Sequence, residues 1–256
     1  MTRIAQSLTL ILLSIVILVG CEKEFDPNDA GKSYNIAKEY YDDENYPIAV
    51  NKLGEFKSRF PYSKYAVEAE LLVANCFFEM GDYDEASIAY EAFVKLHPTH
   101  EKVDFAMFRI GMSYWKEAPE ETNREQEFTI EAIDQWKKLV ESNPDSKYVE
   151  EAKKLMATGK RRLAESYEVV GNFYCKQEIY HACVSKFMDL LEKYSEYNDI
   201  SYNALVKAAG ALTKLAEEKK KDPSLDTNLF FKTMTYEQML EKAEGFLSSA
   251  KKLKNG

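Results

Sequence analysis

Glycine and proline are scarce in this chain, which has ten and seven of them among 256 residues. Because both residues interrupt helices, their scarcity favours a helical fold over a sheet-rich one. Basic residues are also fewer than acidic ones, 34 against 43, so the net charge of −9 predicts a surface that repels nucleic acid and anionic lipid headgroups. The hydrophobic fraction of 45% excludes an intrinsically disordered chain and is sufficient for a large buried core.

Residue types that carry catalysis or bind metals are equally few. Of three histidines, His97 and His100 lie on either side of Pro98 in an expected loop, and His181 opens an expected helix close to Cys183. None has the spacing to cysteine or carboxylate residues that a zinc site needs, and the sequence has neither a phosphate-binding glycine loop nor a Gly-x-Ser-x-Gly motif. We therefore predict no catalytic residue, no metal site, no cofactor and no enzymatic activity.

The amino terminus contains a long apolar run, Ile4–Val19, which follows Arg3 and precedes Gly20 and Cys21. A basic residue, an apolar stretch and a small residue before the cleavage point are typical of a secretory signal, and the ending Leu-Val-Gly-Cys resembles a bacterial lipoprotein signal. The resemblance implies removal of residues 1–20 and a mature Cys21 that carries an N-acyl group and an S-diacylglycerol lipid, palmitate among its acyl chains. The alternative is an uncleaved anchor, although the run is shorter than the ~20 apolar residues that cross a bilayer.

Acylation of Cys21 would hold the chain on a membrane without a spanning helix, because several acyl chains bury many CH2 groups worth ~0.8 kcal/mol each. Glu22 follows the cysteine, whereas by resemblance to lipoprotein sorting rules an aspartate would favour the inner membrane; we predict the periplasmic face of the outer membrane. Residues 21–32 are rich in polar and turn-forming side chains, which predicts a lipidated flexible tether. The folded domain is then expected to begin near Lys32.

Three further cysteines follow Cys21. Disulfides persist outside the cytoplasm, and Cys175 and Cys183 flank a predicted turn, so a bond between them is one alternative. Buried free thiols are the commoner state at apolar helical positions. We expect Cys76, Cys175 and Cys183 to be reduced.

A 37-residue repeat runs through the first part of the chain. Six positions recur at identical intervals: Ala37, Tyr40, Ala49, Leu53, Phe56 and Pro61 in the first copy, and Ala74, Phe77, Ala86, Tyr90, Phe93 and Pro98 in the second. Small residues let two helices approach closely, large residues fill the space beside them, and the proline ends the second helix. The pattern resembles the tetratricopeptide repeat (TPR), a helical hairpin that buries its apolar face by stacking on its neighbours.

Later copies follow the pattern less strictly. The third copy has Gly111, Ala132 and Trp136, with about nine extra residues in a charged turn over 118–128. The fourth copy keeps small residues at Gly171 and Ala182 but places Lys186 at an apolar position. The fifth copy, over 202–252, keeps little beyond a helical period. Residues 146–177 contain no proline, which predicts one long helix. It would join repeats 1–3 in residues 33–145 to repeats 4–5 in residues 146–256. The predicted fold is all-α, with about five TPR-like helical hairpins stacked as a superhelical solenoid.

The first helix of each repeat is expected to line the concave side of the superhelix. By helical period, the residues that face this groove are Tyr34, Lys38, Tyr41, Leu71, Asn75, Phe78, Phe108, Met112 and Trp115. Most are aromatic or aliphatic, and two supply polar anchors, which suits an extended or helical peptide with aromatic side chains. The alternative is that these side chains pack against neighbouring repeats.

Several stretches resemble one family, the outer-membrane protein assembly factor BamD, a lipoprotein of five TPR-like repeats. They are the lipoprotein signal, Arg59-Phe60-Pro61-Tyr62-Ser63, and His97-Pro98-Thr99-His100 followed by residues 103–111. The resemblance implies a non-enzymatic subunit of the β-barrel assembly (BAM) complex. It also implies that the amino-terminal repeats bind unfolded outer-membrane proteins in the groove above, and that the carboxy-terminal repeats, over about Lys186–Lys252, hold the barrel subunit BamA beside other BAM lipoproteins.

One departure from the family is the short turn of the third hairpin, where many members carry a longer insertion. Any partner contact that the longer loop provides is therefore not expected here. The alternative function is a periplasmic TPR scaffold that coordinates cell-envelope or peptidoglycan assembly. Related scaffolds typically lack the acylated cysteine and carry a coiled-coil segment, whereas this chain has the cysteine and no such segment.

Overall fold

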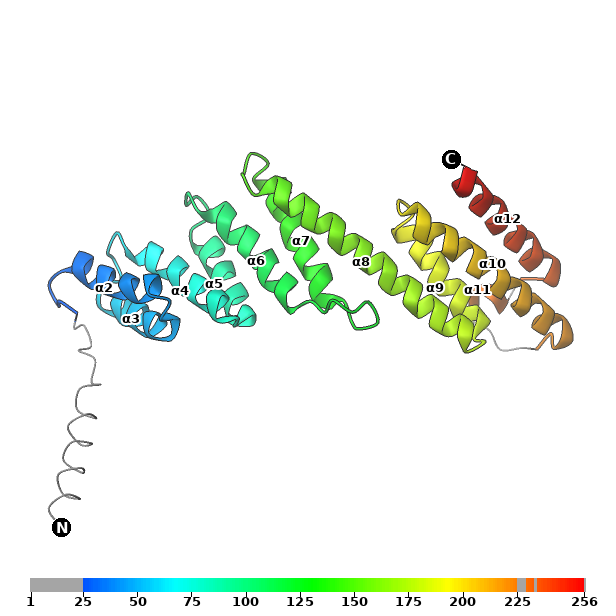
Figure 1. Cartoon of the computed structure of the whole chain (residues 1–256), viewed down its shortest axis with the longest axis horizontal. Helices are drawn as coiled ribbons and strands as arrows, with labels where there is room; N and C mark the ends of the chain where they lie inside the picture. The colour runs from blue at the N-terminus through cyan, green and yellow to red at the C-terminus, as the bar shows by residue number, and fades with distance from the viewer. Residues whose placement is uncertain (1–24, 225–228, 233, 256) are drawn as a thin grey trace, which may run out of the picture. The chain divides into compact units, whose positions relative to one another are not determined.

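The computed structural model describes residues 25–224, 229–232 and 234–255, and the regular secondary structure within these ranges is entirely helical (Figure 1). The predicted signal segment and Cys21 lie outside the described residues. The chain divides into two compact units, residues 1–82 and 83–256. Successive antiparallel helical hairpins build both, which confirms the predicted all-α, TPR-like repeat fold. No described helix is long and apolar enough to span a bilayer.

The first unit contains three helices, α2 (Ala30–Asp42), α3 (Tyr46–Arg59) and α4 (Ala66–Met80). Ala37 and Ala49 are fully buried and let α2 and α3 approach, while Leu53 and Phe56 fill the space beside them, as the repeat predicts. Helix α4 ends at Gly81, whose φ of +83° is the left-handed conformation that only glycine adopts without strain.

The first unit begins earlier than the sequence predicts. Phe25 is only 9% exposed and packs in the core of this unit, and the Lys52 ammonium lies 5.4 Å from its ring centroid. Asp29 accepts a hydrogen bond from the Lys32 backbone N–H at 2.9 Å and thereby caps α2. The segment expected to be a tether up to residue 32 thus contains a core aromatic residue and a helix cap, two features that its polar composition concealed.

The second unit contains the remaining hairpins. Its helices are α5 (Tyr83–Leu96), α6 (Val103–Glu117), α7 (Glu127–Ser142), α8 (Val149–Lys176), α9 (Tyr180–Lys193), α10 (Asn198–Lys221), α11 (Leu229–Lys232) and α12 (Tyr236–Asn255). The single helix α8 confirms the long helix predicted for residues 146–177. Figure 1 shows α7, the second helix of the third hairpin, beside the first half of α8, and α9, its partner in the fourth hairpin, beside the second half.

The charged turn between α6 and α7 is compact rather than simply exposed. Gln126 is 7% exposed, and its Nε2 donates to the carbonyl oxygens of Pro119, Glu121 and Arg124 at 3.0–3.4 Å. Its Oε1 accepts from the Thr129 hydroxyl at 2.7 Å. One buried amide therefore holds the turn together through hydrogen bonds to its backbone, while glutamates 120, 121 and 125 remain at the surface.

The fourth repeat is regular, and the predicted alignment of its second helix was wrong by one residue. Cys183, Phe187 and Leu190 are fully buried and occupy the small and apolar positions of the repeat. The sequence alignment had assigned the first two of these positions to Ala182 and Lys186. Phe187 lies against Gly171, so close that a Cβ there would stand 2.8 Å from the ring Cζ. The interval of sixteen residues between them equals that between Ala37 and Leu53, so an intact repeat was misread as a weak one.

The expectation that the cysteines are reduced was also wrong for two of them. Cys175, near the end of α8, and Cys183, in the first turn of α9, form a disulfide with a Cα–Cα distance of 5.0 Å. Glu178, with a φ of +59°, turns the chain sharply between the two helices and brings the cysteines together. Cys76 is free and buried, and burial raises the pKa of its thiol to about 12.

The fifth hairpin pairs α10 with α12, and a single lysine secures the link between them. Lys219 Nζ donates to the carbonyl oxygens of Phe231, Lys232 and Met234 at 2.7–2.8 Å. Met239 and Ala243 of α12 are buried against α10 in the same core as Phe187. The carboxy-terminal half is thus a packed pair of hairpins, although the sequence of the fifth hairpin keeps little of the repeat.

Candidate functional site

In the first unit, three of the six predicted groove residues are buried. Tyr34 is 7% exposed and stacks on Tyr65, with ring centroids 5.0 Å apart and an interplanar angle of 10°. Leu71 and Phe78 of α4 are 3% and 8% exposed. These side chains fill space between helices, which is the alternative that the sequence left open for them.

The other three predicted residues of this unit, Lys38, Tyr41 and Asn75, are partly exposed on α2 and α4. Lys38 Nζ forms an ion pair with Asp42 one turn further along α2, at 2.6 Å. The Tyr41 ring meets Tyr46 edge-on, with centroids 5.6 Å apart. The unit therefore presents an aromatic edge flanked by a charge pair and an amide, a surface that offers both stacking and hydrogen bonding to a peptide.

The predicted residues of the second unit all lie on α6. Phe108 is 7% exposed and stacks on Tyr148, with centroids 5.1 Å apart. Met112 and Trp115 are partly exposed and pack beside the core around Trp136. The Trp115 ring centroid lies 5.8 Å from that of Trp136, so one side of the Trp115 ring packs against the core and leaves the other face turned away from it.

An arginine that the sequence analysis missed covers that face. The Arg162 guanidinium carbon of α8 lies 4.0 Å from the Trp115 ring centroid, a cation–π geometry, and its Nη1 donates to the Pro119 carbonyl at 3.3 Å. Burial lowers the pKa of Arg162, opposed by Glu120 and Glu165. The adjacent arginines at 161 and 162 were the available signal in the sequence.

Beside Arg162, a hollow of about 500 Å3 opens between the third-hairpin turn and α8. It is lined by Glu120, Thr122, Ala157, Thr158, Arg161, Arg162, Glu165 and Tyr197. Arg161 pairs with Asp199 at 2.6 Å and with Glu165 at 3.1 Å, and its hydrogen bond holds the pKa of the Asp199 carboxyl below its usual value. Both arginines are thus engaged by partners within the chain.

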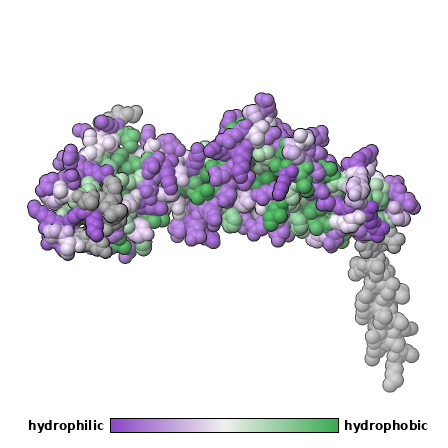
Figure 2. Space-filling model, turned by 180° about the vertical axis from the view of Figure 1, so that it is seen from behind, coloured by the Kyte–Doolittle hydropathy of each residue, from purple (hydrophilic) through white to green (hydrophobic). Residues whose placement is uncertain are grey.

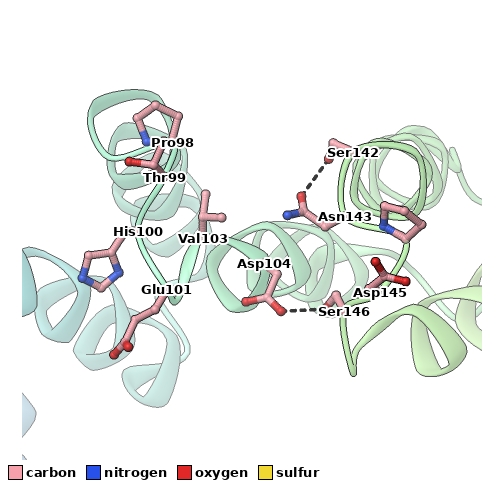
Figure 3. Close-up of a pocket in the computed structure, with 11 residues that line it drawn as sticks. Pro98, Thr99, His100, Glu101, Val103, Asp104, Ser142, Asn143, Asp145 and Ser146 are labelled. Carbon is pink, nitrogen blue, oxygen red and sulfur yellow. Dashed lines mark hydrogen bonds between the residues drawn. The ribbon is translucent and has the colours of Figure 1, made fainter.

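A second hollow of about 500 Å3 lies between the loops that precede α6 and α8 (Figure 3). Asp104 and Ser146 point toward each other across it, and the Ser146 hydroxyl donates to Asp104 Oδ2 at 2.7 Å. His100 lies apart from this pair, and its Nδ1 accepts from the Lys102 backbone N–H at 3.1 Å. These groups cap helices and tie loops together. Over the residues that the structure describes, no group of three or more His, Cys, Asp or Glu side chains could hold a metal ion.

The carboxy-terminal hairpins carry their own surface features. Lys186 Nζ of α9 lies 3.9 Å from the ring centroid of Tyr167, and Lys193 Nζ donates to the hydroxyl of the same tyrosine at 2.8 Å. That hydrogen bond raises the pKa of Lys193. The surface in Figure 2 is mainly hydrophilic with separate hydrophobic patches; in this half of the chain, the exposed apolar side chains include Phe173 and Val206, at 56% and 37%.

The fold defines a TPR-like helical repeat protein that carries aromatic and charged side chains on its surface. The family YfiO, described as outer membrane lipoprotein, matches residues 27–226, and the chain belongs to this family.

Relatives called outer membrane protein assembly factor BamD are similar over most of the chain. The one from Vibrio cholerae is 26% identical over 72% of this chain and 82% of its own length. The one from Rickettsia prowazekii is 23% identical over 87% and 90%, and the one from Neisseria meningitidis serogroup A is 26% identical over 76% and 74%. Among solved structures, the TPR2AB domain of yeast Sti1 in its pHSP90 complex is similar, with 14% identity, coverage of 88% of this chain and 87% of that chain, and a TM-score of 0.45.

Proposed function

We propose that this chain is a lipid-anchored, non-enzymatic subunit of a β-barrel assembly complex on the periplasmic face of the outer membrane. The observation that carries the proposal is the family match over residues 27–226, together with relatives that bear the name of an outer-membrane protein assembly factor. The lipid is expected on Cys21 as an N-acyl group and an S-diacylglycerol. A Cys21→Ser variant should accumulate as uncleaved precursor or appear in the soluble fraction; unchanged maturation and membrane association would contradict the anchor.

The proposed substrate is an unfolded outer-membrane protein. Each unit would offer its own contact surface: Tyr41 on α2 in the first unit, and Met112 and Trp115 on α6 in the second. These aromatic and aliphatic side chains, with the polar Lys38 and Asn75 in the first unit, support a peptide ligand with aromatic side chains, such as a barrel protein's carboxy-terminal segment. Tyr34, Leu71, Phe78 and Phe108 are buried and are left out of the proposed contact surface.

Site-specific photocrosslinking tests this assignment. A photoreactive amino acid at Tyr41 or Met112 should crosslink to a denatured barrel protein, because both side chains are partly exposed at the edge of a core cluster. Matched probes at Asp43 and at Ile88, which is 66% exposed, should give little product. Equal crosslinking at all four positions would show non-specific contact and reject the groove.

The barrel-forming subunit is the proposed partner of the carboxy-terminal hairpins. Two features support this partner: the resemblance of the chain to the BamD family, and the cluster of Tyr167, Lys186 and Lys193. This cluster presents positive charge on a chain whose net charge is −9. We expect Lys186→Glu to reduce co-purification of a barrel protein that has soluble periplasmic domains. Lys160→Glu, at an exposed position on α8, should not. If native protein instead retains only peptidoglycan-linked partners, the chain is an envelope scaffold and this proposal fails.

A further inference from the structure

The folded part of this protein starts very close to the residue proposed to carry the lipid. Phe25 is buried in the core of the first unit, and the Ser33 hydroxyl donates to the Asp26 carbonyl at 2.9 Å. Asp26 Oδ1 also accepts from the Asn28 backbone N–H at 3.0 Å. The chain is therefore fixed to the unit from residue 25 onward.

Only four peptide steps separate Cys21 from Phe25. Even fully extended, they span at most about 14 Å. An acylated Cys21 would place its sulfur at the membrane surface, because its acyl chains lie within the bilayer. The short distance then limits how far the first unit can stand from the lipid, whereas a flexible tether up to residue 32 would allow nearly three times that reach.

The same end of the unit carries a fully exposed aromatic residue. The loop between α3 and α4 reaches the start of α2, since Tyr65 stacks on Tyr34 and lies beside Gly31. Tyr62, at the tip of this loop, is 99% exposed. The loop is well ordered by hydrogen bonds from Ser63 N to the Phe60 carbonyl and from Tyr65 N to the Ser63 hydroxyl, at 3.0 and 3.2 Å.

Charge at this end does not oppose contact with lipid. Its ionisable groups include Lys32, Arg59 and Lys64 against Asp26, Asp29, Glu55 and Glu68, which is close to balance, whereas the whole chain carries a net charge of −9. The pairs Lys32–Asp26 and Arg59–Glu55, at 3.4 and 2.8 Å, neutralise one another. A tyrosine with nearby lysine and arginine side chains is the combination that lies at a membrane–water interface, with the ring among the headgroups.

We propose that this end of the first unit, with Tyr62 at its tip, lies on the lipid headgroups of the membrane that holds Cys21. The inference rests on the proposed acylation of Cys21. It adds an orientation: the start of α2 and the α3–α4 loop face the bilayer, and the α2–α3 turn at Asp43 faces away. Because α2 has 13 residues, these two ends are about 20 Å apart.

A fluorescent label compares the two ends directly. Tyr62→Cys and Asp43→Cys each introduce one accessible thiol, because Cys76 is buried and Cys175 is bonded to Cys183. The lipidated full chain is labelled with an environment-sensitive dye and reconstituted in phosphatidylethanolamine–phosphatidylglycerol vesicles. We expect a blue-shifted emission, loss of quenching by aqueous iodide and quenching by headgroup-labelled lipid at position 62. At position 43 the emission should stay unshifted, with full iodide quenching.

A variant with a lengthened tether tests whether position 62 lies at the membrane only because the short tether holds it there. Insertion of about twenty Gly and Ser residues after Glu24 adds a flexible segment with a mean span of about 25 Å, and the label at position 62 should then become accessible to iodide. Vesicle flotation of the wild type and of Cys21→Ser measures the anchor separately. If the wild type floats with the vesicles but iodide still quenches the label at position 62, the proposed orientation is wrong and the anchor stands. The same holds if position 62 contacts a protein instead of lipid. Failure to float overturns both proposals.

Discussion

The indole ring of Trp136 lies directly against the bare Cα of Gly111. A Cβ placed on Gly111 would stand within 2.7 Å of the indole Cε2, closer than real Cβ contacts. The indole Nε1 also donates to the Phe108 carbonyl at 3.2 Å, one turn before the glycine. The absence of a side chain at residue 111 therefore sets how closely α6 and α7 approach.

Gly111→Ala should accordingly destabilise the third hairpin. The added methyl group forces Trp136 or the helix backbone to move, and overpacking of a core costs about 1–3 kcal/mol. The free energy of unfolding of the second unit, measured in urea, should fall by this amount and the midpoint should decrease. The intrinsic preference of helices for alanine would partly offset the loss.

Gly210→Ala is the matched control. Gly210 also lies inside a helix, α10, but a Cβ there would meet nothing within 4 Å. Replacement of an exposed helical glycine should stabilise the protein by about 0.5–1 kcal/mol. If both substitutions shifted stability in the same direction, the close contact between Gly111 and Trp136 would not limit the packing of the hairpin.

The repeat pattern predicted the architecture because each copy places small residues opposite large ones at fixed intervals. Ala37, Ala74 and Gly111 recur every 37 residues, and their partners follow at a constant distance apart from the third-hairpin insertion. The same rule would have aligned Gly171 with Phe187. It failed there because Ala182, a second small residue, stands directly before the true position at Cys183.

The predicted groove residues divided mainly by their position in the repeat. Tyr34, Leu71 and Phe108, which are 37 residues apart, are all buried, whereas Lys38, Asn75 and Met112 are all partly exposed. The third position varies, since Phe78 is buried while Tyr41 and Trp115 are partly exposed. Exposure on such a face depends on what the next element supplies, and Arg162 reaches Trp115 from 47 residues further along the chain. The disulfide likewise depended on the turn geometry at Glu178, which composition does not reveal.

Gln126→Ala should open the turn between α6 and α7. It removes the amide that donates to three backbone carbonyls and leaves the Thr129 hydroxyl without its acceptor. Loss of hydrogen bonds to buried groups costs about 1–3 kcal/mol. Trypsin should cut after Arg124 faster in the variant than in the wild type. The exposed change Glu120→Ala, which lies away from the cleaved bond, should leave the cleavage rate unchanged, and faster cleavage there would mean that the turn is held by its surface charges.

Reduction of the Cys175–Cys183 bond should lower stability. A bond that closes a loop of eight residues restricts the unfolded chain by an amount equivalent to about 2.5 kcal/mol. Urea unfolding with and without dithiothreitol should show this difference in the wild type. In Cys175→Ser, which spares the buried Cys183, the reductant should have no effect. An equal response of both proteins would mean that the bond is not the source of the difference.

Stability of the first unit should depend on alkaline pH through Tyr34. Burial, with the nearby Glu68 carboxylate, raises the pKa of Tyr34 from the ordinary 10.0 to about 12. Below pH 10 the phenol keeps its proton in both the folded and the unfolded chain, so the group contributes no pH dependence there. Between about pH 10 and 12 the unfolded chain loses this proton first, which favours unfolding, so stability falls as the pH rises through this range.

Tyr34→Phe keeps the ring that stacks on Tyr65 and removes the proton. Wild type and variant should have similar unfolding midpoints at neutral pH, and the wild type should lose more stability than the variant as the pH approaches 12. Tyr62→Phe is the control, since a tyrosine that is 99% exposed meets the same solvent when folded and unfolded. A decline in the Tyr34→Phe variant as steep as in the wild type would assign the alkaline transition to other groups, the buried Cys76 thiol first among them, because burial raises its pKa in the same direction.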